Sequence, residues 1–256
     1  MKIGCCIDLR QIDDIAGLGF DFVDLNGQEL ANCTAEQAER LLLRLKELRL
    51  PCLGLHATVP AKVRLNGPGF DGDTAANYFR LLAQRAAALD VRYLGIGSPA
   101  ARSLPDGYPR EAADDEFCAS LAAAAEAFPN ALVLVEALNR SETNYVNSYA
   151  EACVLVRRAA HPAVRTVLDL YHFAKCGDDP AALDRDEFGL ACYLHIADPE
   201  GRAFLSNATS PEFMKMAERI ARRTMCAEIA IEAVTDDLRR DAAAALAILR
   251  TMFAEN

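Results

Sequence analysis

Residues 164–170, VRTVLDL, form a short apolar run that reaches a carboxylate, Asp169, near its end. Seven further runs of similar character occur along the chain, at residues 2–8, 20–25, 52–57, 92–97, 131–138, 190–197 and 227–233. Near-continuous apolar runs of this length are typical of parallel β-strands that are buried on both faces. The sequence therefore predicts eight parallel strands.

Amphipathic segments lie between these runs, and the clearest cover residues 35–50, 75–89, 116–128, 149–160 and 237–256. Their apolar residues recur at three- and four-residue spacing, which marks one buried face of a helix. Alternating strands and helices predict a parallel sheet. Eight such units without a GxGxxG phosphate loop favour a closed (β/α)8 barrel, or TIM barrel, over a doubly wound sheet. The expected domain is a single one, residues 1–256.

Composition and charge restrict the class of protein further. Hydrophobic residues make up 52% of the chain, which is enough for a large core, and the formal net charge is -10. That charge repels nucleic-acid phosphates, so no nucleic-acid partner is expected. Nine cysteines without a CxxC pair are typical of free thiols. The N-terminal residues are too acidic for a signal peptide, and no apolar stretch reaches the length of a membrane span. We expect a cytoplasmic protein that does not enter a membrane.

Four late strands end on side chains that can bind a metal, namely Glu136, Asp169, His195 and Glu232. The carboxyl ends of the strands meet at one face of such a barrel, and this face carries the active site. A charged group directly after an apolar run is costly unless something compensates it, and a shared divalent cation would do so. Three carboxylates and one imidazole suit Mn²⁺, Co²⁺ or Mg²⁺, with Zn²⁺ as a further possibility. For any one of them alone, a carboxylate hydrogen-bonded to a neighbouring loop remains an alternative.

Other polar residues are less specific. His172 follows Asp169 by three residues and could reach the same pocket, whereas His56, at the end of the third strand, could serve in packing or in substrate contact. Arg165 and Glu228 each lie four residues before a candidate ligand. Because strand side chains alternate, both should point into the barrel, and we predict an ion pair between them.

The strand-end motifs EALNRSETN from Glu136, DLYHFAK from Asp169, HIADPEGR from His195 and IEA at the end of the eighth strand resemble a known family. This family comprises the xylose isomerase-like sugar isomerases and epimerases, including ketose 3-epimerases, and the resemblance spans almost the whole chain. It implies that one divalent metal is held by Glu136, Asp169, His195 and Glu232. It also implies that the substrate is contacted by Glu142, His172 and Arg202. The chain differs from the family at Asp24, often a glutamate, and after Arg202, where a Pro-Gly turn is usual.

The expected reaction removes a proton next to a carbonyl of a small sugar or sugar phosphate, through a metal-stabilised enediolate. Glu136 and Glu232 would abstract and return that proton. Arg102, Arg140 and Arg202 could bind a phosphate, so phosphorylation of the substrate stays open. Homo-oligomers are common among soluble enzymes, and one is possible here.

Three alternatives remain from the sequence. A hydroxypyruvate isomerase-type or inosose dehydratase-type enzyme would use the same metal and the same proton abstraction. An endonuclease IV-like DNA repair enzyme would need three zinc ions and many histidines, and the chain has four. A non-catalytic binding barrel would not need to retain all four candidate ligands.

Overall fold

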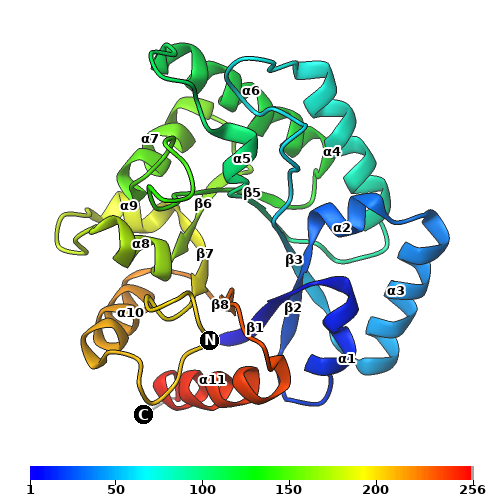
Figure 1. Cartoon of the computed structure of the whole chain (residues 1–256), viewed down its shortest axis with the longest axis vertical. Coiled ribbons are helices and arrows are strands. Elements are labelled where there is room, and N and C mark those ends of the chain that lie inside the picture. Colours follow the sequence, from blue (N-terminus) through cyan, green and yellow to red (C-terminus); the bar gives the residue numbers. More distant parts are fainter. Residues whose placement is uncertain (255–256) are drawn as a thin grey trace.

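A computed structural model describes residues 1–254, and its eight strands close into one barrel (Figure 1). The strands are β1 (Lys2–Ile7), β2 (Phe22–Asn26), β3 (Cys52–His56), β4 (Tyr93–Ile96), β5 (Leu132–Glu136), β6 (Val164–Asp169), β7 (Ala191–Ile196) and β8 (Glu228–Ile231). Each strand pairs in parallel with the next, and β8 closes the barrel by pairing with β1, where Glu228 lies opposite Lys2. The predicted (β/α)8 barrel is confirmed.

Helices surround the barrel (Figure 1). They are η1 (Leu9–Gln11), α1 (Ile12–Ile15), α2 (Gly27–Asn32), α3 (Ala35–Leu48), α4 (Gly72–Ala86), α5 (Pro99–Arg102), α6 (Arg110–Ala127), α7 (Tyr149–Ala159), α8 (Leu170–Cys176), α9 (Arg185–Leu190), α10 (Pro211–Arg223) and α11 (Leu238–Met252). The five predicted helices correspond to α3, α4, α6, α7 and α11. The last was predicted to continue to residue 256 but ends at Met252, and residues 255 and 256 lie outside the described part. No helix within residues 1–254 is long and apolar enough to cross a membrane.

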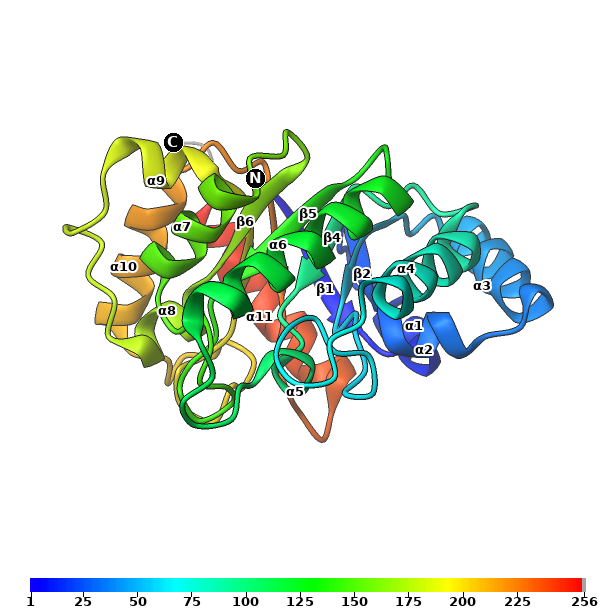
Figure 2. The ribbon, with the colours of Figure 1, turned by 90° about the horizontal axis from the view of Figure 1, so that it is seen from above.

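The apolar core has two layers. Alternate strand residues fill the inside of the barrel, namely Cys6, Phe22, Leu53, Leu134, Val167, Tyr193 and Ala230. The residues between them, such as Ile229 and Ile231 of β8, face outward and pack in the larger layer between strands and helices. Because side chains fill the interior, room for a small molecule is found only at the barrel ends. The βα loops, including α5, gather at the end opposite the chain termini (Figure 2).

The predicted ion pair between Arg165 and Glu228 is wrong. Both side chains are described, and no contact within 4.0 Å joins their charged groups. The buried Glu228 instead accepts a hydrogen bond from the Tyr93 hydroxyl at 3.1 Å. Arg165 is only half-buried and donates to the carbonyl oxygen of Val164 at 2.8 Å. The irregularity in the β6–β7 pairing places its extra residue, Cys192, in β7, so the spacing along β6 stays even and the prediction failed on side-chain contacts alone.

Candidate metal centre

Four consecutive strands bring the candidate ligands together at one end of the barrel. Glu136 and Asp169 are the last residues of β5 and β6, His195 is the penultimate residue of β7, and Glu232 directly follows β8. One donor atom from each of the four residues lies within 4.8 Å of the other three. Three of the side chains are buried, and Glu232 is half-buried. We refer to these four residues as the ligand cluster.

Each member of the ligand cluster has one donor atom without a hydrogen-bond partner. These atoms are Glu136 Oε1, Asp169 Oδ2, His195 Nδ1 and Glu232 Oε2. Nδ1 of His195 lies 2.9 Å from Glu232 Oε2 and 3.7 Å from Glu136 Oε1. Buried polar atoms are otherwise almost always satisfied, and three of these four are carboxylate oxygens whose nearest positive groups are His195 and Arg202. The arrangement therefore fits one divalent metal ion.

The electrostatics of the cluster are those of crowded buried charges. Burial raises the pKa of Asp169, while Arg202 acts in the opposite direction. Burial also raises the pKa of Glu232, but Arg202 and His195 outweigh this effect and hold the pKa well below its usual value. For His195, burial lowers the pKa, yet nearby Cys6 and carboxylates outweigh it and raise the pKa well above its usual value.

Asp169 also organises the residues around it. Its Oδ1 accepts the backbone N–H of His172 at 3.1 Å and caps α8, which leaves Oδ2 free for the ligand cluster. The backbone N–H of Asn139 donates to His172 Nδ1 at 3.1 Å, so that nitrogen carries no proton. Burial lowers the pKa of His172, and the neutral ring therefore keeps its proton on Nε2. Nε2 has no partner and lies 3.9 Å from Glu142 Oε1.

Arg202 connects two of the acidic residues. Its Nη2 lies 3.2 Å from Glu232 Oε1, its Nη1 lies 3.5 Å from Glu142 Oε1, and its guanidinium lies 5.3 Å from the ring centre of Tyr171. Burial lowers the pKa of Arg202, but Glu232, Asp169 and the other acids outweigh it and raise the pKa. The guanidinium is therefore a permanent cation beside the cluster.

Backbone strain occurs around the same end of the barrel. Ala57 after β3, Ser98 after β4 and Arg202 after β7 adopt positive φ values of 45°, 42° and 55°. Non-glycine residues rarely adopt this conformation, and such residues gather at functional sites. Gly97, between β4 and Ser98, is required for a steric reason, because a Cβ there would lie 2.2 Å from Glu136 Oε2. A side chain at position 97 would occupy the space that Glu136 uses.

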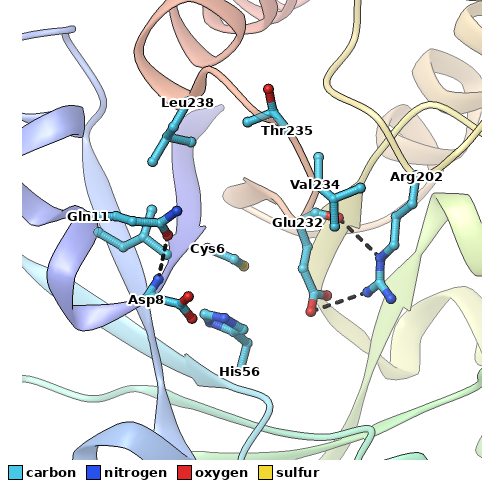
Figure 3. A pocket seen from close by; sticks show the side chains of 11 residues that line it. Cys6, Asp8, Gln11, His56, Arg202, Glu232, Val234, Thr235 and Leu238 are labelled. Atoms are coloured by element: carbon cyan, nitrogen blue, oxygen red, sulfur yellow. Dashed lines mark hydrogen bonds and ion pairs between the residues drawn. The ribbon is translucent and has the colours of Figure 1, made fainter.

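A cavity of about 320 Å³ opens beside Glu232. In Figure 3, Asp8, Gln11 and His56 face Glu232 and Arg202 across it. The ring of His56 has an unpartnered Nδ1, and burial lowers its pKa. Asp8 and Gln11 were not predicted as site residues. Asp8 directly follows the first strand, so the strand-end position that marked the ligand cluster would also have marked Asp8.

The three arginines considered for a phosphate site do not form one. Arg102, the last residue of α5, is completely buried, and its three guanidinium nitrogens have no hydrogen-bond partner. Burial lowers its pKa to about 10. Arg140 is exposed, and Arg202 is already paired with two carboxylates.

Comparison with known proteins places this geometry in context. Residues 12–251 match the family model described as Xylose isomerase-like TIM barrel. The D-psicose 3-epimerase of Clostridium cellulolyticum H10, solved with D-tagatose, is 20% identical with a TM-score of 0.78, covering 98% of this chain and 99% of that one. An L-ribulose 3-epimerase is 18% identical with a TM-score of 0.80, covering 98% and 94%. A family 2 AP endonuclease of Brucella melitensis is 20% identical with a TM-score of 0.78, covering both chains completely.

At these identities the structural likeness establishes the fold alone. The same barrel carries sugar epimerases and a protein described as an endonuclease, so the overall shape does not select between them. A comparison with curated protein sequences gives no match. The ligand cluster and its surroundings are therefore the features that distinguish one function from another.

Proposed function

Because this chain belongs to the xylose isomerase-like TIM barrel family, we propose that it is a metal-dependent sugar isomerase or epimerase. Four unpartnered donor atoms within 4.8 Å of one another carry this proposal. We assign one divalent ion to Glu136, Asp169, His195 and Glu232. The oxygen-rich donor set favours Mn²⁺, Co²⁺ or Mg²⁺ and is also compatible with Zn²⁺.

The proposed reaction moves a proton at a carbon next to a carbonyl. When bound, the cation would supply Lewis acidity to the carbonyl oxygen and so make that proton acidic enough to remove. Glu136 ends β5 and Glu232 directly follows β8, with Asp169 and His195 on the two strands between them. One carboxylate takes the proton and the other returns it from the opposite side, which is what inversion at the carbon requires.

Two further residues would stabilise the charge that develops on the substrate oxygen. Nε2 of His172 carries the proton of a neutral ring and has no partner, so it can donate a hydrogen bond to that oxygen. Arg202 supplies a fixed positive charge next to Glu232. Donors placed in advance in a buried site typically contribute about 10²–10³-fold to kcat. Glu142 and His56 are proposed to contact substrate hydroxyls.

An unphosphorylated sugar suits this pocket better than a sugar phosphate. Arg102 is inaccessible, Arg140 is exposed, and Arg202 already neutralises part of the acidic cluster. The opposite wall adds the carboxylate of Asp8. A dianionic phosphate would therefore meet these carboxylates without a free arginine or lysine side chain to pair with it. The cavity of about 320 Å³ lies at the lower end of the range for small-molecule sites, which is about 300–1,000 Å³.

Ketohexoses are the first substrates to test, since the D-psicose 3-epimerase with this fold was solved with D-tagatose. The Mn²⁺-loaded protein would be incubated with D-fructose, D-tagatose and D-psicose in deuterated water, and NMR would follow the products. We expect a product epimer with deuterium at the inverted carbon. A dehydratase or a hydroxypyruvate isomerase-type enzyme would instead give a dehydrated product or act on a three-carbon substrate.

Substitutions on one strand provide a matched control. Glu232→Gln should lower turnover by about 10³-fold because it removes the carboxylate that exchanges the proton. Glu228→Gln makes the same chemical change at the other end of β8 and should retain turnover. Glu136→Gln should resemble Glu232→Gln. Near-normal turnover of either cluster variant would refute the assigned roles, and absence of exchange with every ketose tested would refute the ketose substrate.

A nuclease function has less support. A three-zinc site of the endonuclease IV type needs many histidines, and this chain has four. One of them, His161, follows α7 and accepts a hydrogen bond from the backbone of Ala163. The net charge of -10 also disfavours DNA.

A further inference from the structure

We propose that Asp24 is a positioning residue for His195. Asp24 holds the imidazole ring of His195 so that Nδ1 faces the ligand cluster and Nε2 carries the proton. This role presupposes the ion site of the proposed function and assigns a part to a residue outside the four ligands. Asp24 lies in β2, whereas His195 lies in β7, so the two residues meet across the interior of the barrel.

The carboxylate of Asp24 is almost completely buried, with 1% of the residue exposed. Its Oδ2 accepts a hydrogen bond from the Tyr193 hydroxyl at 2.7 Å and lies 3.8 Å from His195 Nε2. Its Oδ1 has no hydrogen-bond partner. A buried carboxylate is costly unless a positive or N–H group lies near it, and His195 Nε2, near Oδ2, is such a group.

The neighbouring strand leaves space for this carboxylate. Gly54 of β3 pairs with Asp24, and a Cβ at position 54 would lie 2.6 Å from the carboxylate atoms of Asp24. Tyr193 stacks on Tyr93 with ring centres 4.4 Å apart. The hydroxyl that holds Asp24 is therefore itself held in place by packing.

The two nitrogens of His195 face different surroundings. Nδ1 faces Glu232 and Glu136, whereas Nε2 faces Asp24 and the Cys6 sulfur, which is 4.0 Å away. A nitrogen that binds a metal must carry no proton, and a neutral imidazole has a single proton. With Nδ1 as the ligand atom, the proton must be on Nε2, beside the carboxylate of Asp24.

The contact between Asp24 and Nε2 is electrostatic at its present length. A separation of 3.8 Å exceeds the range of a hydrogen bond. In a buried setting, however, attraction between a carboxylate and an N–H group is weakly screened. Groups that orient metal-binding histidines in this way typically change metal affinity by about 10–100-fold when removed.

The first test reads the position of the proton in the wild-type protein, and substitutions serve only to assign its signals. Long-range ¹H–¹⁵N NMR of the Zn²⁺-loaded chain reports the protonated nitrogen of each histidine, and the four histidines can be assigned with His56→Gln, His161→Gln and His172→Gln variants. We expect the proton of His195 on Nε2. A proton on Nδ1 would overturn the proposal.

The second test is Mn²⁺ affinity, measured by titration. Asp24→Asn and Asp24→Ala should weaken binding by about 10–100-fold. Glu228→Gln, at the far end of the tyrosine stack, and Cys6→Ser, the other neighbour of Nε2, should bind as the wild type does. Unchanged Mn²⁺ affinity in both Asp24 variants would overturn the role of Asp24 and leave the proposed function standing. A loss of affinity in Cys6→Ser as large as that in the Asp24 variants would do the same. Failure of the wild type to bind Mn²⁺ or Zn²⁺ would overturn the proposed function and this role with it.

Discussion

Replacing Gly97 by alanine should displace Glu136 from the ligand cluster. The added carbon would lie 2.2 Å from Glu136 Oε2, and real Cβ atoms essentially never approach another atom closer than 3.0 Å. The carboxylate must therefore move by at least 3.0 − 2.2 = 0.8 Å. Gly97 has no positive φ, so the alanine backbone itself is unstrained and the effect is purely steric. A displacement of about 1 Å at a catalytic group can cost about 10²-fold in rate.

Weaker metal binding should accompany the loss of rate in Gly97→Ala. If Glu136 leaves the cluster, Mn²⁺ affinity should fall by about 10–100-fold, or about 1.4–2.8 kcal/mol. The assay is a Mn²⁺ titration together with deuterium exchange into the sugar product. Gly189→Ala is the matched control, because a Cβ at that helical position meets nothing within 4 Å. Wild-type affinity and turnover in Gly97→Ala, with its fold verified by circular dichroism, would refute the assigned position of Glu136.

Three further predictions concern the surroundings of the cluster. Arg202→Gln removes a charge that faces Glu232, so kcat should fall by about 100-fold while metal content stays unchanged; an unaltered kcat would exclude Arg202 from the reaction. Burial lowers the pKa of His56 from its usual 6.5, so the unfolded chain binds the proton more readily than the folded chain does. The free energy of unfolding should therefore fall as the pH drops below 6.5. Urea unfolding of His56→Gln should show a weaker dependence on pH, and an identical dependence would contradict the assignment. Mn²⁺ at 100 times its Kd should add about 2.7 kcal/mol to the free energy of unfolding of the wild type, and a similar gain in Asp169→Asn would argue against a cluster-bound ion.

The barrel and the meeting of four polar side chains could be predicted because both follow from simple periodicity. Eight apolar runs separated by amphipathic segments leave few arrangements other than a closed parallel barrel. Residues at the carboxyl ends of its strands must then face a common centre, which is why Glu136, Asp169, His195 and Glu232 lie within 4.8 Å of one another.

The remaining details depend on side-chain reach and local register. The Arg165–Glu228 pair was wrong because the Tyr93 hydroxyl reaches Glu228 and because Arg165 donates to the carbonyl oxygen of Val164 instead. The space that Gly97 leaves for Glu136 follows from the path of one side chain, which strand patterns do not specify. Likewise, Asp24 lies inside β2 and contacts His195, which lies five strands later in β7. This contact could not be predicted, because the two strands face each other only once the barrel is closed.

The metal content of the purified chain tests the central claim most directly. After loading with Mn²⁺ and removal of excess ion, the wild type and Glu228→Gln should each retain about one ion per chain. Glu136→Gln and His195→Ala should retain much less, because each loses one of the four donor atoms that face one another. No bound metal in the wild type, or equal retention in both cluster variants, would contradict the proposed ion site.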